Sequence, residues 1–174
     1  INLFLPMTLA GTLAGKEESA LLSSSPTAVP EGHYEAESMR QTVVPGRNLL
    51  FLSAAAAVAE AIARRDGTIV RLVCGVHQGD HYIYPDCRPE FIRAARWAIA
   101  TGSEDRVSLV APLLDMTKVE VVKLGQEWSV PFEILRTCYT NEPVACGRCG
   151  ACRERLEAFE KNGLKDPIAY QESK

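Results

Sequence analysis

Hydrophobic residues fall into runs along the chain whose spacing predicts alternating helices and strands. From Asn48 to Arg65 an Ala-, Leu- and Val-rich run holds no Gly or Pro and stops before Asp66-Gly67, so we expect a buried helix there. The next run, TIVRLVCGV (68–76), is rich in β-branched residues and almost continuously apolar. That pattern is typical of a parallel strand covered on both faces.

The same alternation continues toward the C-terminus. Proline at a first helical turn, followed by apolar residues at helical spacing, predicts a helix over 89–102. VSLVAP (107–112) predicts a second strand. Thr117, with Glu120 three positions later, predicts a capping box at the start of a helix that continues to Gly125. Strands that alternate with helices predict an α/β fold with a doubly wound parallel sheet, whose ligands lie at the carboxyl ends of the strands.

Two stretches near the N-terminus have a different character. INLFL (1–5) is a short apolar run of strand type. SSSPTAVPEGHYEAESMR (23–40) is rich in Ser, Pro, Gly and Glu, and it is too long for a simple connection. Loops of this kind often form a lid or stay unfolded.

Composition and charge narrow the class of protein. With 47% hydrophobic and 24% charged residues, the 174-residue chain is expected to form a globular fold. A net charge of -3 provides no general attraction to nucleic acid or to anionic membranes. No uninterrupted apolar run reaches the about 18 residues of a membrane span, and the longest, Leu49 to Ile62, contains Ser53 and Glu60. Because the N-terminal run also lacks a basic leader, we expect a cytoplasmic protein.

Four of the six cysteines lie within fifteen residues, with seven, two and two residues between them. They are Cys138, Cys146, Cys149 and Cys152. Two-residue gaps let a loop turn its sulfur atoms toward one ion, and Gly147 and Gly150 permit the positive φ that such loops use. Four thiolates complete a tetrahedral zinc site without an open position, so we expect a structural role.

Two alternatives to zinc remain open. Three cysteines in a CxxCxxC pattern, with a fourth further away, also suit an iron–sulfur cluster, and the thiols could stay reduced without a metal. Clustering in a chain of ordinary composition favours metal ligation over disulfides. Cys74, inside the predicted strand, is expected to be a small buried hydrophobic residue instead.

Polar residues follow the predicted strands and precede the predicted helices. Arg47 and Asn48 stand at a helix N-terminus, where backbone N–H groups and a guanidinium could hold a phosphate or carboxylate. The alternative is a capped helix with a solvated arginine. Lys118 begins the helix after the second strand and could direct its ammonium toward the same cleft.

The loop HQGDHYIYPDCRPEF (77–91) follows the first predicted strand. Its candidate substrate-binding residues are Asp80, Tyr84, Asp86, Cys87 and Arg88. The carboxylates could accept hydrogen bonds from a heterocycle, the tyrosine could stack on it, and the thiol could act as a nucleophile. The alternative is a polar loop without a ligand. His77 and His81 are expected at the surface or in the loop, because the intervening Gly79 argues against a helical metal pair.

Four motifs in order resemble the 7-cyano-7-deazaguanine synthases of queuosine biosynthesis. They are VPEGHYEAESMRQTVVPGRNLLFLS (29–53), GVHQGDHYIYPDCRPEF (75–91), PLLDMTKVEVVKLG (112–125) and CYTNEPVACGRCGACRERLEAFEKNGLKDPIAY (138–170). The resemblance covers nearly the whole chain. It implies an ATP-pyrophosphatase (PP-loop) fold, with a partial α/β domain over 1–135 and a zinc-binding segment over 136–174 packed on it.

The resemblance also implies an activity. The carboxylate of 7-carboxy-7-deazaguanine is adenylated by ATP, ammonia then gives an amide, and a second adenylation permits dehydration to the nitrile. The four clustered cysteines would be zinc ligands, and the loop from Asp80 to Arg88 would help to form the deazapurine pocket. Lys118 and Arg47, with Mg²⁺, would neutralise phosphate charge. A homodimer is implied as well.

One family feature is absent from these 174 residues: the SGGxDS loop that holds the ATP pyrophosphate. The serines at 23–25 cannot replace it, because glycines are needed for close approach of backbone N–H groups to phosphate. The first strands of the fold are also missing. The chain is therefore expected to be either a fragment or a shortened relative, and to be inactive in synthesis by itself.

Two alternatives to this activity remain open. One is a non-catalytic module that binds a deazapurine or a partner. The other is a relative that uses tRNA or a protein amine as acceptor, although the acidic balance disfavours tRNA.

Overall fold

The computed structural model describes residues 19–21 and 25–172, so the strand predicted at 1–5 lies outside the described residues. The chain forms two compact units. The first contains Pro45–Asp115, and the second joins the segment ending at Val44 to the segment beginning at Met116. The boundary expected after residue 135 falls inside the second unit, and the division into an α/β domain and a zinc-binding segment stays a prediction.

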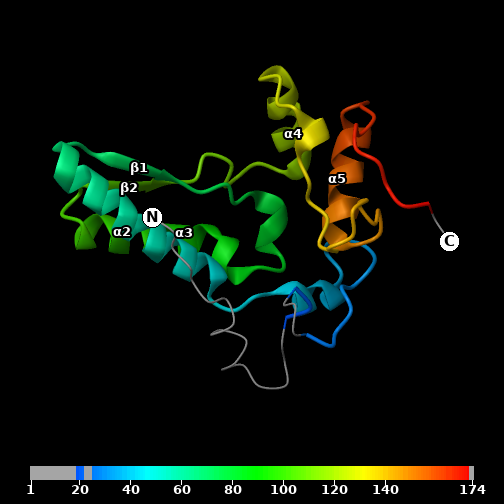
Figure 1. Cartoon of the computed structure of the whole chain (residues 1–174), viewed down its shortest axis with the longest axis horizontal. Helices are drawn as coiled ribbons and strands as arrows, with labels where there is room; N and C mark the ends of the chain where they lie inside the picture. The colour runs from blue at the N-terminus through cyan, green and yellow to red at the C-terminus, as the bar shows by residue number, and fades with distance from the viewer. Residues whose placement is uncertain (1–18, 22–24, 173–174) are drawn as a thin grey trace. The chain divides into compact units, whose positions relative to one another are not determined.

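Within its described residues, the first unit contains two parallel strands, two helices and two short 3-10 turns (Figure 1). In chain order these are α2 (Arg47–Asp66), β1 (Val70–Val73), η2 (Gln78–His81), η3 (Pro85–Cys87), α3 (Pro89–Gly102) and β2 (Val107–Val110). Proline at the first position of α3 fits its place because proline lacks the N–H that a first turn leaves unpaired. Gly67 ends α2 in the left-handed conformation, at φ 63°. The two helices and two strands lie where the hydrophobic pattern predicts them. The expectation that α2 is buried is wrong, because only Leu52, Ala59 and Ala63 of this helix are buried and Leu49 is 54% exposed.

A parallel pair of strands forms the sheet of the first unit. Val70 pairs with Val107, and the register continues to Val73 and Val110. On one face, Leu109 is buried with Leu52 of α2 and Ala95 of α3. Both helices therefore cover the same face, and the predicted parallel sheet with packed helices is confirmed.

The opposite face of β1 differs from the prediction of a strand covered on both sides. Burial alternates along β1, and Val73 is 64% exposed. Since α2 and α3 share one face, neither of these helices, the two described in this unit, packs over the side chains of Arg71 and Val73. A continuous apolar run therefore did not distinguish a strand buried on one face from a strand buried on two.

The part of the second unit that the structure describes contains two helices and two 3-10 turns. They are η1 (Glu37–Thr42), α4 (Lys118–Glu127), η4 (Phe132–Ile134) and α5 (Gly150–Lys161). The predicted capping box at α4 is confirmed: the Glu120 N–H donates to Thr117 Oγ1 at 3.3 Å, and the Thr117 N–H donates to Glu120 Oε2 at 2.7 Å. Both bonds satisfy donors that a helix N-terminus otherwise leaves unpaired.

The core of the second unit joins α4 to α5. Val122 of α4 is buried with Ala158 and Phe159 of α5, and Phe132 packs edge-on against Phe159 with ring centroids 5.1 Å apart. Gly125 leaves the space for Phe132, because a Cβ at that position would lie 2.5 Å from the ring. The two helices are thus fixed against each other by interlocking side chains.

The described part of the predicted 23–40 loop is joined to the cysteine segment. Glu31 forms an isolated antiparallel bridge with Cys149. The Gly32 N–H donates to the Arg148 carbonyl at 2.9 Å. This stretch of the loop therefore packs within the second unit and belongs to the surroundings of the cysteines.

One stretch, Glu37–Asp66, is long and apolar enough for a membrane span by length and composition alone. This finding differs from the expectation based on uninterrupted apolar runs. The stretch includes the break between η1 and α2, where Gly46 has φ 69°. Helices that pack on a sheet meet the same criterion, and α2 packs on β1 and β2 through Leu52.

Candidate functional site

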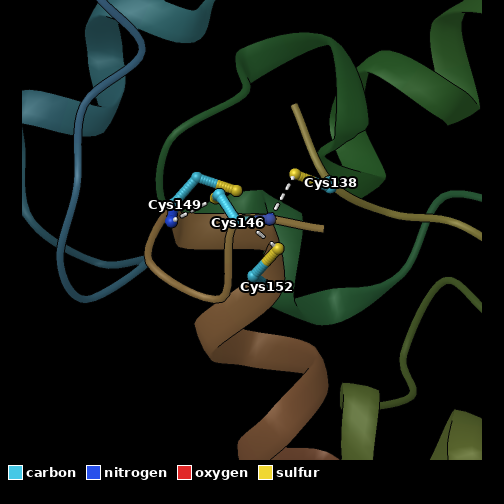
Figure 2. Close-up of side chains that lie close together, drawn as sticks. All are labelled: Cys138, Cys146, Cys149 and Cys152. Atoms are coloured by element: carbon cyan, nitrogen blue, oxygen red, sulfur yellow. Dashed lines mark hydrogen bonds between the residues drawn. The ribbon is translucent and has the colours of Figure 1, made fainter. Parts of the chain in front are cut away.

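Four cysteine side chains gather at the start of α5 (Figure 2). They are Cys138, Cys146, Cys149 and Cys152, whose Sγ atoms all lie within 4.8 Å of one another. A tetrahedral zinc site with Zn–S bonds of about 2.3 Å has sulfur atoms about 3.8 Å apart. The predicted cluster is confirmed, and its geometry fits one structural zinc ion with no position left for substrate.

Backbone N–H groups point at two of these sulfur atoms. The Cys146 N–H donates to Cys138 Sγ at 3.3 Å, and the N–H groups of Arg148 and Cys149 donate to Cys146 Sγ at 3.4 and 3.3 Å. Such donors stabilise thiolates. A shared hydrogen bond with Cys152 lowers the pKa of the Cys149 thiol to about 5 and raises the pKa of Cys152. Without a metal the cluster therefore favours a thiolate at Cys149, whereas Cys152 and, through burial, Cys146 have raised pKa values, so zinc binding would displace protons from them.

The two glycines of the segment serve different purposes. Gly147 has φ 71°, as the spacing predicted. Gly150, expected to need positive φ, is instead the first residue of α5 and lies in a tight contact. A Cβ there would be 2.7 Å from Met39 Sδ and 3.3 Å from Tyr34 Cα, so glycine allows the η1 segment to pack against α5.

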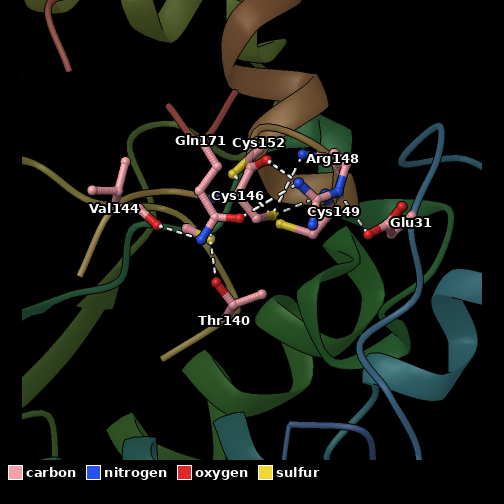
Figure 3. Close-up of polar contacts among 9 residues, drawn as sticks. Glu31, Thr140, Val144, Cys146, Arg148, Cys149, Cys152 and Gln171 are labelled. Carbon is pink, nitrogen blue, oxygen red and sulfur yellow. Dashed lines mark hydrogen bonds and ion pairs between the residues drawn. The ribbon is translucent and has the colours of Figure 1, made fainter. Parts of the chain in front are cut away.

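Arg148 connects the cysteine loop to two distant parts of the chain (Figure 3). Its Nε donates to Glu31 Oε1 at 2.8 Å, and its Nη1 donates to the Cys146 carbonyl at 3.3 Å and to Gln171 Oε1 at 3.4 Å. The Gln171 N–H in turn donates to the Ala145 carbonyl at 2.9 Å. These contacts were not predicted, because Glu31 and Arg148 lie 117 positions apart.

A buried ion pair lies beyond the cysteines on α5. Arg155 donates from Nε and Nη2 to the two carboxylate oxygens of Asp166, at 2.7 and 2.8 Å. Its remaining donors bind the carbonyls of Leu135 and Phe132 at 2.6 and 2.9 Å. Tyr170 donates to Asp166 Oδ2 at 2.6 Å. This network, which no local motif announces, fixes the segment after α4 and the C-terminal segment to the helix that carries Cys152.

In the first unit, a carboxylate caps the N-terminus of α2. The Asn48 N–H donates to Asp86 Oδ2 at 3.1 Å, and Asn48 Nδ2 donates to the Asp86 carbonyl at 3.1 Å. Arg47 Nε donates to Asn48 Oδ1 at 3.2 Å. The predicted placement of Arg47 and Asn48 at a helix N-terminus is confirmed, and the anion found there is the chain's own aspartate.

Replacing Asp86 by alanine is expected to lower the free energy of unfolding by about 1 kcal/mol, because the α2 N-terminus loses its side-chain acceptor. Urea unfolding followed by circular dichroism measures the change. Asp86→Asn is the matched variant, since it keeps an acceptor oxygen and should lose less. Equal stabilities of the aspartate and alanine proteins would show that the cap contributes nothing.

Cys87 is buried beside this cap, with Asn48 Nδ2 donating to its sulfur at 3.3 Å. Burial, then the carboxylates of Asp80 and Asp86, raise the pKa of Cys87 to about 12. The thiol therefore stays protonated near neutral pH, and the structure does not support the nucleophile considered from sequence. Its place in the loop remains compatible with a substrate contact.

The remaining loop residues are organised by local hydrogen bonds. The Tyr84 N–H donates to the Asp80 carbonyl at 2.9 Å, and Arg88 Nε donates to the His81 carbonyl at 2.8 Å. His77 lies in the loop, one of the two placements expected for it, and it is buried there: its Nδ1 accepts from the Gly79 N–H, and its Nε2 lies 3.4 Å from Asp80 Oδ2. The turn thus needs its histidine for structure, which spacing alone did not reveal.

Lys118 belongs to the second unit, where it is the first residue of α4. Its Nζ lies 3.5 Å from Glu154 Oε2 on α5. The structure therefore brings Asn48, Asp86 and Cys87 together in the first unit and places Lys118 beside α5 in the second.

Comparisons with known proteins place these features in a family. The family model for queuosine biosynthesis protein QueC matches residues 4–163. The chain belongs to the QueC family. It is 46% identical over 153 residues to the 7-cyano-7-deazaguanine synthase of Caldicellulosiruptor saccharolyticus, covering 88% of this chain and 65% of that protein. It is 41% identical over 148 residues to the synthase of Pseudoalteromonas atlantica, covering 85% and 66%.

The family assignment confirms the resemblance seen in the four motifs. The chain spans slightly less than two thirds of the length of these QueC relatives. The four cysteines lie inside the region that the QueC family model matches.

Proposed function

We propose that this chain contributes to the ATP-dependent conversion of 7-carboxy-7-deazaguanine and ammonia to 7-cyano-7-deazaguanine. The observation that carries the proposal is the 46% identity to a 7-cyano-7-deazaguanine synthase over 88% of the chain. The enzyme is a carbon–nitrogen ligase. ATP adenylates the substrate carboxylate and releases pyrophosphate, ammonia displaces AMP to give the amide, and a second adenylation lets the amide lose its oxygen with AMP.

The roles of individual residues follow from their chemistry and from the family. Arg47 and Lys118 neutralise phosphate charge, with Mg²⁺ sharing that task. The deazapurine pocket is formed by Asn48 of α2 and by loop residues Asp80, Tyr84, Asp86, Cys87 and Arg88. Support comes from the cap that joins Asn48 to Asp86, which fixes one end of this loop against α2. The protonated thiol of Cys87 then acts as a contact rather than a nucleophile.

Zinc in the four-cysteine cluster supplies structure rather than chemistry, because four thiolates leave no open coordination position. The fold in this proposal is the doubly wound sheet of the PP-loop ATP-pyrophosphatases, in which β1 and β2 are two of the parallel strands. We further infer a homodimer in the cytoplasm that binds neither membrane nor nucleic acid. The net charge of -3 supports a small-molecule substrate over tRNA.

The test uses a joined protein, in which the 174 residues of this chain are fused to the segment of a relative that carries the SGGxDS loop. With carboxydeazaguanine, ATP, Mg²⁺ and ammonia, the joined protein is expected to release AMP and form the nitrile, detected by mass spectrometry. Lys118→Ala should lower kcat by about 100-fold if its ammonium neutralises phosphate charge. Glu160→Gln on α5 is the surface control.

The 174 residues without the loop are the second control and should release no AMP. A joined protein that folds and binds zinc but forms no amide or nitrile would contradict the proposed function. AMP release by the 174 residues alone would contradict the need for the loop.

A further inference from the structure

Lys118 and Glu154 form an ion pair in a partly enclosed position. The ammonium and the carboxylate are 3.5 Å apart, with side chains 22% and 12% exposed. Lys118 is the first residue of α4, and a cation at a helix N-terminus faces the positive end of the helix dipole. The Glu154 carboxylate offsets that repulsion. Because the pair is partly enclosed, the carboxylate holds the ammonium in place more strongly than it would in an exposed pair.

The backbone on either side of this pair is fixed by packing between α4 and α5. Val122 is buried against Ala158 and Phe159. Asn162, just after α5, donates from Nδ2 to the Val119 carbonyl at 2.9 Å. The backbone next to Lys118 is therefore tied to the far end of the helix that carries Glu154.

The other end of α5 begins in the cysteine cluster. Cys149 is the N-cap residue of α5, and Cys152 lies two positions before Glu154 on the same helix. At Gly150 the first turn of α5 lies close to Met39 and Tyr34. An ion held by the four thiolates would hold this first turn, and with it Glu154, in place.

We propose that Glu154 is a positioning residue for Lys118, and that its hold on the ammonium depends on the metal bound by the cysteines. The significance of this link rests on the proposed function, in which Lys118 neutralises phosphate charge. A structural metal then acts on the reaction without touching substrate, through Cys152, Glu154 and Lys118 in turn. Coordination of the ion by four cysteines does not by itself connect the metal to Lys118.

The test follows the reaction of Lys118 with an amine-specific acylating reagent in the full zinc-loaded chain, using peptide mass spectrometry. Glu154→Gln is expected to raise the labelling rate of Lys118 by about three- to fivefold, the factor that corresponds to losing a partly enclosed ion pair. Glu154→Asp should restore most of the slow rate, because it keeps the carboxylate. Glu160→Gln makes the same change at an exposed position of α5 and should leave Lys118 unaffected.

Removing zinc with a chelator should raise the Lys118 rate in the wild-type chain, but should add little in Glu154→Gln, where the link is already broken. Melting curves identify variants that have unfolded. If Glu154→Gln is one of them, the labelling rate of Lys118 in Glu154→Asp is compared with the rate in wild type instead. Unchanged labelling of Lys118 in folded Glu154→Gln would overturn the inference whatever the activity. Altered labelling together with absent nitrile formation in the joined protein would instead refute the proposed function and leave the pairing established.

Discussion

Replacing Cys149 by alanine is expected to abolish zinc binding and to destabilise the second unit. Cys149 is 1% exposed, and it supplies both a thiolate and the N-cap position of α5. Binding of zinc to four-cysteine sites contributes on the order of 10 kcal/mol, which in small metal-bound units is also free energy of folding. Losing one ligand should therefore cost several kcal/mol. Metal analysis by mass spectrometry and thermal unfolding followed by circular dichroism measure the two effects.

Cys74→Ala is the matched control for this prediction. Cys74 is a partly buried cysteine of the first unit that packs among apolar side chains outside the cluster. Its replacement should retain the metal and cost only about 1 kcal/mol of packing. Full zinc occupancy in Cys149→Ala, with an unchanged melting temperature, would show that the cluster does not hold a structural ion. Iron and labile sulfide in the purified protein would show instead that the iron–sulfur alternative is correct.

The features predicted well from sequence are those that a few neighbouring residues determine. Thr117 and Glu120 form their capping box within one turn, so residue types alone specify it. The cysteines lie close enough along the chain that any compact loop brings most of them together. The boundaries of α3 follow from Pro89 and from the glycine at 102.

The features missed from sequence depend on partners that are distant along the chain. The Asp86 carboxylate caps α2 from 38 positions away, a pairing that the residues around the helix N-terminus do not indicate. The exposure of Val73 depends on which face of the sheet α2 and α3 cover. Gly150 seemed to be needed for its backbone angle, whereas its contact with Met39 appears only when the η1 segment is in place. Hydrophobic periodicity carries no information on such pairings.

Replacing Asp166 by asparagine is expected to lower the free energy of unfolding by about 3–5 kcal/mol, the cost of leaving one member of a buried ion pair uncompensated. The side chains of Arg155 and Asp166 are only 4% and 2% exposed, so little water can take the place of the lost partner. Asparagine keeps the shape but removes the charge that Arg155 contacts with two donors. Chemical denaturation at pH 7 measures the loss.

The pH dependence of stability provides an independent check on the same carboxylate. Burial opposes ionisation of Asp166, but hydrogen bonds from Arg155, Tyr170 and the Ile168 N–H outweigh it and lower the pKa below its usual 3.8. A lowered folded-state pKa means that the contribution is complete above the unfolded-state value and is lost as the pH falls through the folded one. Wild type should therefore lose stability on acidification below about pH 4, more steeply than Asp166→Asn. Glu157→Gln, which breaks the partly exposed ion pairs of Glu157 with Lys161 and His33, should cost about 1 kcal/mol. If the asparagine and wild-type proteins lose stability in parallel on acidification, Asp166 is not ionised by its contact with Arg155.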